Sequence, residues 1–228
     1  MSGPAQPLAP WLQRQLTELM GLRGHAVLLA GPSGLGQVDL GLALVRAWLC
    51  EQPGPAGACG QCGSCHAIDV RTHADLCVLM PETLSIELGW PLDETAQRDI
   101  DEKKRKPSKL IRVEAARQAV AFTQTTRSRG RIKAVLVVPA ERLNMESANT
   151  LLKTLEEPAG DVRFVLVTEA AHLLLPTIRS RCLTHTLSWP PEAEALAWLH
   201  GQAGQGTSDA QVRAWWQASG GRPDDALA

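Results

Sequence analysis

Tyrosine is absent from this chain of 228 residues, and phenylalanine occurs only twice. No apolar run approaches the ~20 residues that a membrane-spanning helix needs. The first residues, MSGPAQPLAP, lack the basic and then apolar layout of a signal peptide. Charge is also nearly balanced, with 23 Lys and Arg against 24 Asp and Glu, so no strong net field favours nucleic acid or an anionic membrane. We therefore expect a cytoplasmic protein.

A second absence lies in residues 27 to 38, VLLAGPSGLGQV, where an apolar strand runs into a glycine-rich phosphate loop. An active loop of this kind ends in G-K-[ST], because the lysine contacts the β- and γ-phosphates and the hydroxyl binds magnesium. Gln37 and Val38 hold those two positions here. Gln37 carries no charge, and Val38 has no atom that could bind a metal. The sequence thus predicts the scaffold of a nucleotide-hydrolysing fold without its chemistry.

The carboxylates that organise the metal in such folds are also missing. They are expected at the end of the third strand, where this chain has Val138 and Pro139. Glu141 is the nearest acid, and we expect it to point elsewhere. Gly31, Gly34 and Gly36 still allow backbone amides to turn toward a phosphate. The loop could therefore be a tight turn that meets no nucleotide or a site of weak residual binding, and hydrolysis is the least supported alternative.

Four of the six cysteines fall within sixteen residues, spaced C-x8-C-x2-C-x2-C. Cys50, Cys59, Cys62 and Cys65 offer the four thiolates that surround a structural zinc ion tetrahedrally. His66 could substitute for one ligand, and a redox pair or free thiols are the alternatives. Clustered cysteines in a cytosolic chain favour metal over disulfides. We therefore predict one structural Zn2+ in a small module at about residues 50 to 66.

Apolar runs separated by helical patterns predict an α/β fold with a parallel sheet covered on both faces. We expect strands at about 25–30, 75–80, 131–138, 162–168 and 183–187, and helices at about 8–20, 38–49, 110–124 and 145–155. Residues 51–66 should form no regular element, and the charged stretch 91–109 should be a solvated loop. A DNA-contacting basic tip at 103–106 is the less favoured alternative for part of that loop.

After Pro190 and Pro191 the pattern becomes purely helical. We expect a core domain over residues 1–168 and a small helical lid domain over 169–228. The predicted lid core consists of Trp189, Leu196, Leu199, Val212 and Trp215.

These pieces together resemble the AAA+ clamp-loader family, which includes subunits of bacterial DNA polymerase III. The resemblance covers nearly the whole chain and rests on AGPSGLGQV, CGQCGSC with Cys50, THADL at 72 to 76, SANTLLKTLEEP at 147 to 158, FVLVT at 164 to 168 and TIRSRC at 177 to 182. It implies a pentameric loader that opens a sliding clamp and places it on primed DNA during replication. Gln37, Val38, Val138 and Pro139 make this chain similar to a non-hydrolysing member.

The resemblance also implies roles for particular residues. Arg181 in S-R-C would act in trans as an arginine finger at the ATP site of a neighbouring subunit, and Arg179 could share that work. The four cysteines match the zinc ligands of the family. The expected partners are the ATPase (gamma/tau) and delta subunits. Family members normally continue into a helical collar, which we expect to be missing from this chain.

Two alternatives remain open at this stage. One is an ATP-hydrolysing, gamma/tau-like subunit whose loop tolerates substitutions. The other is a free-standing zinc module that binds nucleic acid, which would need a basic face with aromatic residues. Residues 50 to 80 contain only Arg71 as a permanently charged base and no aromatic residue, so this alternative is weak.

Overall fold

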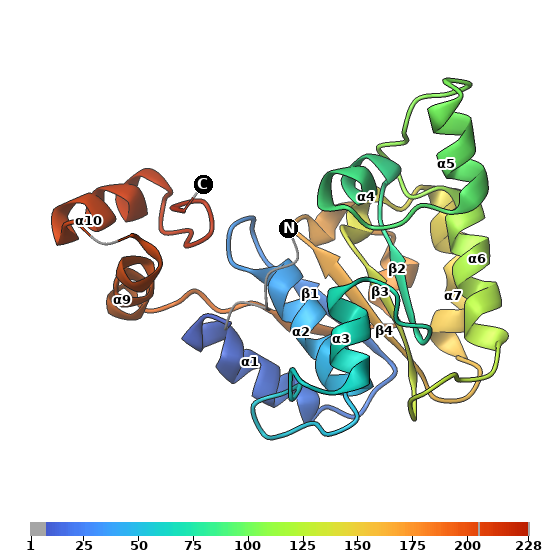
Figure 1. The fold of residues 1–228 in the computed structure, drawn as a ribbon, viewed down its shortest axis with the longest axis horizontal. Coiled ribbons are helices and arrows are strands. Elements are labelled where there is room, and N and C mark those ends of the chain that lie inside the picture. The colour runs from blue at the N-terminus through green and yellow to red at the C-terminus, as the bar shows by residue number, and fades with distance from the viewer. Residues whose placement is uncertain (1–7, 205, 228) are drawn as a thin grey trace.

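A single parallel sheet forms the centre of the molecule. The computed structural model describes residues 8–204 and 206–227. The strands are β1 (Ala26–Ala30), β2 (Leu76–Leu79), β3 (Lys133–Val137), β4 (Val162–Thr168) and β5 (Leu183–Thr186). They lie in the order β2-β3-β4-β1-β5, and every neighbouring pair is parallel. The predicted α/β fold with a parallel sheet is confirmed (Figure 1).

Helices connect the strands and cover the sheet. Their bounds are α1 Pro10–Met20, α2 Gln37–Leu49, α3 Gly63–Asp69, α4 Glu82–Leu88, α5 Glu94–Asp101, α6 Val113–Gln124, α7 Met145–Glu156, α8 Pro176–Arg179, α9 Glu192–Gln202 and α10 Asp209–Ala218. Short 3-10 turns lie at Ala140–Arg142 and Ala171–Leu173. Within the described residues, no helix is long and apolar enough to cross a membrane.

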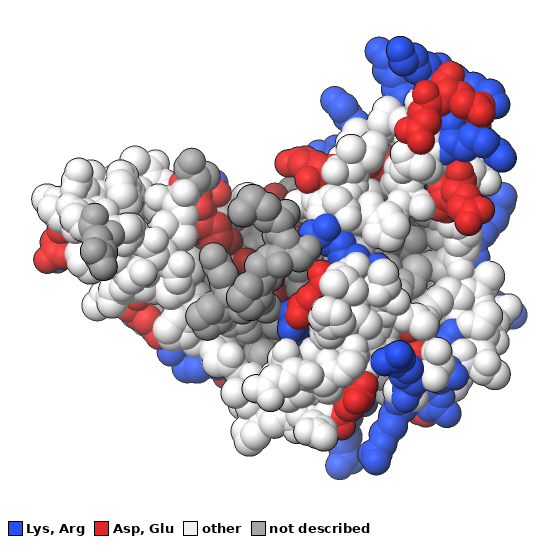
Figure 2. Space-filling model, viewed as in Figure 1, with Lys and Arg blue, Asp and Glu red and all other residues white. Residues whose placement is uncertain are grey.

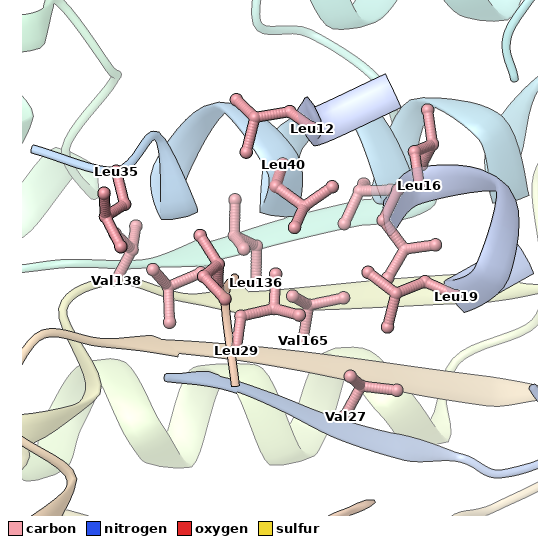
Figure 3. Close-up of a cluster of buried hydrophobic side chains, with 14 of the residues drawn as sticks. Leu12, Leu16, Leu19, Val27, Leu29, Leu35, Leu40, Leu136, Val138 and Val165 are labelled. Carbon is pink, nitrogen blue, oxygen red and sulfur yellow. The ribbon is translucent and has the colours of Figure 1, made fainter. Parts of the chain in front are cut away.

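The sheet separates two hydrophobic clusters. On one face, Leu29, Leu136 and Val165 pack under the leucines of α1 and α2, as Figure 3 shows. On the other face, neighbouring strand residues such as Leu28 and Phe164 pack against α6 and α7. Successive strand side chains point to opposite faces, so strands covered on both sides must be apolar throughout. This explains why β1, β3 and β4 can be recognised in the sequence as apolar runs.

Helix α1 joins the sheet to the C-terminal helices. Trp11 is 2% exposed and meets Trp198 of α9 edge to face, with ring centroids 5.2 Å apart. Arg14 forms two 2.7 Å hydrogen bonds with the Glu194 carboxylate. Helices α9 and α10 contact each other and are reached from the sheet through residues 187–191 (Figure 1). Leu199 and Val212 are buried as expected, but Trp189 and Trp215 are 53% and 39% exposed, so they were wrongly predicted as core.

Residues 91–109 are solvated, as predicted, but they are not all loop, because helix α5 occupies Glu94–Asp101. Helix α5 begins there because the Asp93 carboxylate accepts hydrogen bonds from the backbone N–H groups of Thr95 and Ala96. Arg105 then holds Glu82 through bonds of 2.6 and 2.8 Å. In Figure 2 the lysines and arginines at this end of the molecule are interspersed with acids. This surface therefore lacks the uniform positive charge that a DNA-contacting tip would have.

The cysteine-rich segment also contains more regular structure than predicted. Helix α3 starts at Gly63, inside the range 51–66 that was expected to be irregular. The Cys62 sulfur accepts a hydrogen bond from the Cys65 N–H at 3.4 Å and so acts as the helix cap. Cysteine is not among the usual capping residues, so no ordinary capping signal marks this helix start in the sequence.

Candidate functional site

The phosphate loop connects β1 to α2 in the expected place. Gly34 and Gly36 have φ angles of 81° and 83°, a conformation that side chains rarely adopt. Gly36 is the residue immediately before α2, so the loop leads into the helix N-terminus. The glycines thus build the turn of a phosphate-binding loop. Gly31 begins the loop after β1 and lies against the Leu187 side chain.

The end of the loop is neutral and buried. Gln37 is 2% exposed, and its Nε2 donates a 3.1 Å hydrogen bond to Glu169 Oε1. Its Oε1 has no hydrogen-bond partner among the described residues. A lysine here would supply positive charge to a nucleotide phosphate, whereas the carboxamide is used to join α2 to the end of β4. Val38 has no polar side-chain atom.

The end of β3 offers hydrophobic groups where a metal would need carboxylates. Val138 is 4% exposed and lies in the same cluster as Leu35 of the loop (Figure 3). Glu141, which we expect to point away from such a metal position, accepts a 3.3 Å hydrogen bond at its Oε1 from the Glu169 N–H. Gln37 and Glu141 therefore contact the same residue. The Glu141 carboxylate thus binds the backbone of the turn after β4.

The four clustered cysteines form a site with the dimensions of a tetrahedral metal centre. Their sulfur atoms all lie within 4.8 Å of one another. Cys50 Sγ and Cys62 Sγ are 3.8 Å apart, which matches the edge of a tetrahedron whose Zn–S bonds are about 2.3 Å. Cys50 comes from the end of α2, Cys59 and Cys62 from the following loop, and Cys65 from α3. The donor set fits zinc.

Backbone amides donate hydrogen bonds to these sulfurs, and the pKa values of Cys59 and Cys62 are lowered, whereas burial raises the pKa values of Cys50 and Cys65. Cys50 Sγ accepts N–H bonds from Cys59 at 3.2 Å and from Gln52 at 3.4 Å. Burial raises the pKa of the Cys62 thiol, but hydrogen bonds from the backbone at Glu51 and Cys65 and from neighbouring cysteines outweigh it, and the pKa falls to about 6. The Glu51 carboxylate also binds the Ser64 N–H and hydroxyl, which fastens the start of α3.

Arg181 follows α8 and contacts its own chain. Its Nη2 lies 3.1 Å from Glu156 Oε2, and its Nη1 donates a 2.9 Å bond to the Thr177 carbonyl. The Arg181 side chain keeps 28% of its surface exposed. Arg179 is exposed at the end of α8. The sequence motif that contains Glu156 does not reveal its pairing with Arg181, because the two residues lie on different elements.

The loop and Arg181 lie at opposite edges of the sheet. We call the edge where the parallel strands begin the amino edge, and the edge where they end the carboxyl edge. Val27 pairs with Leu183 and Ala30 with Thr186. The loop therefore leaves β1 at the carboxyl edge, while Arg181 precedes β5 at the amino edge. At about 3.3 Å per residue, the paired strands alone separate the two sites by roughly 10 Å.

The THADL motif has a structural role. The Asp75 carboxylate is fully buried and accepts hydrogen bonds from the backbone N–H groups of Ser128, Arg129 and Gly130 at 2.7, 2.8 and 3.2 Å. Burial raises the pKa of Asp75, but these three bonds and the nearby His73 lower it overall. His73 Nδ1 in turn accepts the Asp75 N–H at 3.0 Å. The motif thus holds the turn before β3 in place.

The strand order, the glycine loop after β1 and the helices on both faces define a P-loop fold of the AAA+ type. A gamma subunit-related protein of DNA polymerase III from Thermotoga maritima has the same fold, with a TM-score of 0.58 and 20% identity over 95% of this chain and 56% of that one. A variant of RuvB from Thermotoga maritima aligns with a TM-score of 0.54 and 16% identity, covering 95% of this chain and 58% of that one.

Sequence comparison identifies the family within this class. The model described as "DNA polymerase III, delta subunit" matches residues 11–190. The chain is 38% identical over 192 residues to the delta-prime subunit of DNA polymerase III from Pseudomonas aeruginosa, covering 83% of this chain and 52% of that protein. It is 35% identical over 224 residues to the delta-prime subunit from Escherichia coli, covering 96% of this chain and 60% of that protein. The chain belongs to the delta-prime family of DNA polymerase III subunits.

The similarity extends to a sibling subunit. The tau subunit from Salmonella typhimurium is 32% identical over 159 residues, which is 70% of this chain and 21% of that protein. The chain spans 52% to 60% of the length of the two delta-prime relatives described above.

Proposed function

We propose that this chain is a non-hydrolysing subunit of a clamp loader, working in the cytoplasm with ATPase (gamma/tau) and delta subunits. Its role is to help place a sliding clamp on primed DNA by supplying Arg181 to the ATP site of a neighbouring subunit. Membership of the delta-prime family supports this proposal. The chain's own loop ends in buried Gln37 and in Val38, which lack the charge and the metal-binding atom that hydrolysis needs.

The separation of the two sheet edges carries the proposal. Arg181 precedes β5 at the amino edge and cannot reach the loop after β1, because the length of the strands lies between them. Its guanidinium is partly exposed and permanently charged. The strand separation and the exposed guanidinium support the proposal that Arg181 meets a triphosphate on a neighbouring subunit. Hydrogen bonds to the Glu156 carboxylate and the Thr177 carbonyl hold the Arg181 side chain at the surface.

We further propose a structural zinc ion on Cys50, Cys59, Cys62 and Cys65. Zinc would link the end of α2 to the start of α3 across a loop with little hydrophobic core of its own. Four protein ligands would complete its coordination and leave no position for a reacting water molecule. The role assigned to the ion is therefore to stabilise the module.

The trans role is tested by reconstituting the loader with full-length Arg181→Ala protein. Removing an arginine finger lowers the rate at the site it serves by about 10³ to 10⁵. We expect DNA-stimulated ATP turnover and clamp loading to fall while assembly persists. Arg213→Ala, which removes an exposed arginine from α10, is the matched control. Unchanged turnover and loading with Arg181→Ala would count against the trans role.

The chain's own inactivity is tested separately. We expect the purified chain with magnesium and ATP to show no turnover above a protein-free blank. A rate comparable with that of a gamma or tau subunit would instead make it a hydrolysing sibling.

A further inference from the structure

The C-terminal segment, residues 222–227, turns back onto the chain's own phosphate loop. Figure 1 shows the end of the chain facing the loop between β1 and α2. The Asp224 N–H donates a 3.2 Å hydrogen bond to the Gly34 carbonyl. Pro223 is buried and Asp224 is half-buried. Residues from the far end of the sequence therefore lie where a nucleotide would approach the loop.

Side chains leave almost no room above the loop glycines. A Cβ atom added at Gly34 would lie 2.8 Å from Asp225 Cγ. A Cβ at Gly36 would lie 2.5 Å from Leu12 Cδ1 and 3.6 Å from Asp224 Oδ2. Both glycines thus accept close contacts from this chain's own side chains. Backbone amides at such a loop and helix start normally face an anion, and here a carboxylate lies beside them.

The charge beside the loop is negative. The pKa of Asp224 is raised to about 6, first by burial and then by the carboxylates of Asp39 and Asp225, and a hydrogen bond from the Gly36 backbone offsets part of the rise. Burial also raises the pKa of Asp39, in the first turn of α2. Arg222 Nε lies 3.0 Å from Asp225 Oδ2 and so compensates that acid. Asp39 and Asp224 line the same groove, of about 620 Å³. Arg46 and Arg71 also line this groove, but Arg46 is paired with Asp69, and Arg71 donates to the Gly89 carbonyl and lies over Trp90. A nucleotide phosphate that reached the loop would therefore meet the carboxylates of Asp39 and Asp224.

We propose that Asp224 closes this chain's nucleotide site in cis: its carboxylate lies beside the loop amides in place of a phosphate, and with Asp39 it repels nucleotide. Two independent features then exclude nucleotide from the loop. The lysine that would bind phosphate is replaced by Gln37, and the Asp224 carboxylate closes the site. Restoring the lysine and the hydroxyl is consequently not enough to restore binding. This goes beyond the proposed function, because it concerns the chain's own loop and does not depend on Arg181.

The test combines two pairs of substitutions in the whole chain. One pair, Gln37→Lys with Val38→Thr, restores the end of the loop. The other, Asp224→Ala with Asp225→Ala, removes the closing carboxylates. Binding of ATP to the parent and to all three variants is measured by calorimetry with magnesium. We expect the combined variant to bind at least about tenfold more tightly than the restored loop alone. Equal affinity of those two variants would overturn the proposal.

Hydrogen exchange gives a second readout that needs no nucleotide. In the single variant Asp224→Ala, backbone amides at residues 34–37 should exchange faster than in the parent, because the closing contact is gone. Asp209→Ala is the control, since it removes an acid from α10 whose side chain is 91% exposed. If no variant binds ATP, faster exchange at 34–37 still supports the closure. Unchanged exchange in Asp224→Ala contradicts it.

Discussion

The carboxyl and amino edges of the sheet differ in the functional side chains that they carry. At the carboxyl edge, the phosphate loop keeps its glycine geometry, but Gln37 binds Glu169 and Asp224 lies against the loop. At the amino edge, Arg181 stays charged and partly exposed, and α2 ends at the cysteine cluster. Both edges rest on the same two hydrophobic clusters. A fold can therefore lack the chemistry of one edge while it keeps charged groups and a cysteine cluster at the other.

This difference between the two edges shows which residues can be substituted without unfolding the protein. The side chains that would carry hydrolysis sit beyond the strand ends, at the start of α2 and after β3, so Gln37 in place of a lysine leaves the packing of β1 intact. The buried strand residues, such as Leu28 and Phe164, are 0% exposed and have no such freedom.

The largest effect is expected at the amino edge, from Cys62→Ser. If zinc links α2 to α3, losing one of four ligands should abolish stoichiometric metal, because metal binding and folding of such a module are coupled. Elemental analysis and calorimetric melting would show the lost zinc and a lower Tm. Cys182→Ser is the matched control, since Cys182 is a half-buried thiol outside the cluster. Full zinc retention in Cys62→Ser would contradict the proposal that the four cysteines bind a structural zinc ion.

The next effect is a pH dependence at the carboxyl edge. The pKa of Asp224 is raised from 3.8 to about 6, so the folded state binds its proton more tightly than the unfolded state. This group therefore adds stability as pH falls from above 6 toward 4, by at most about 3 kcal/mol. The charged groups around it are Asp39, Asp225 and Arg222.

The measurement is the free energy of unfolding from pH 8 to pH 4, in the parent and in Asp224→Asn. Other carboxylates, such as Asp75 and Glu82, have lowered pKa values and lose their contribution on acidification. The difference between the two proteins isolates Asp224. The variant should be the more stable one at pH 8, and its advantage should shrink toward pH 4. A constant difference across this range would refute the assignment.

A smaller effect is expected from Gln37→Ala. The change removes the hydrogen bond to Glu169, whose own side chain is exposed and can bind water instead. The cost should be about 1 kcal/mol in the free energy of unfolding, measured by urea denaturation. Nucleotide binding should remain undetectable in parent and variant alike. A loss of measurable ATP affinity in Gln37→Ala would show that the carboxamide had been a nucleotide ligand.

The smallest effect on stability is expected from Glu156→Gln at the amino edge. The pair with Arg181 is partly exposed, with 59% of the Glu156 side chain accessible, and such pairs contribute at most about 1 kcal/mol. Because Glu156 holds the guanidinium in place, ATP turnover of the assembled loader should fall several-fold. Glu157→Gln is the neighbouring control. Identical turnover in the two variants would make the ion pair a surface contact without a role.

The sequence predicted the sheet well because buried strands must be apolar on both faces. β4 was expected at 162–168 and is found at Val162–Thr168. Helix α5 was missed because it buries none of its residues, and its start depends on the Asp93 cap rather than on apolar periodicity. The cysteine spacing predicted a cluster that the structure brings together.

Other parts of the site could not be read from local patterns. Asp224 and Gly34 lie far apart in the sequence but are in contact in the structure. Their contact depends on the packing of α9 against α1, which brings the C-terminal segment close to the phosphate loop. The Glu156 partner of Arg181 lies on another helix. The contact that Glu141 makes is determined by the turn after β4, and the distance of Glu141 from β3 along the chain does not reveal it. Such pairings are set by tertiary packing.

The most direct measurement is the structure of an assembled loader containing the full-length protein, with magnesium and a non-hydrolysable ATP analogue. We expect a triphosphate on the neighbouring ATPase subunit, with the Arg181 guanidinium at its γ-phosphate. We also expect Asp224 against an empty loop at Gly34 and Gly36. A metal-bridged triphosphate bound by this chain's own loop, with Arg181 away from the neighbouring γ-phosphate, would contradict both expectations.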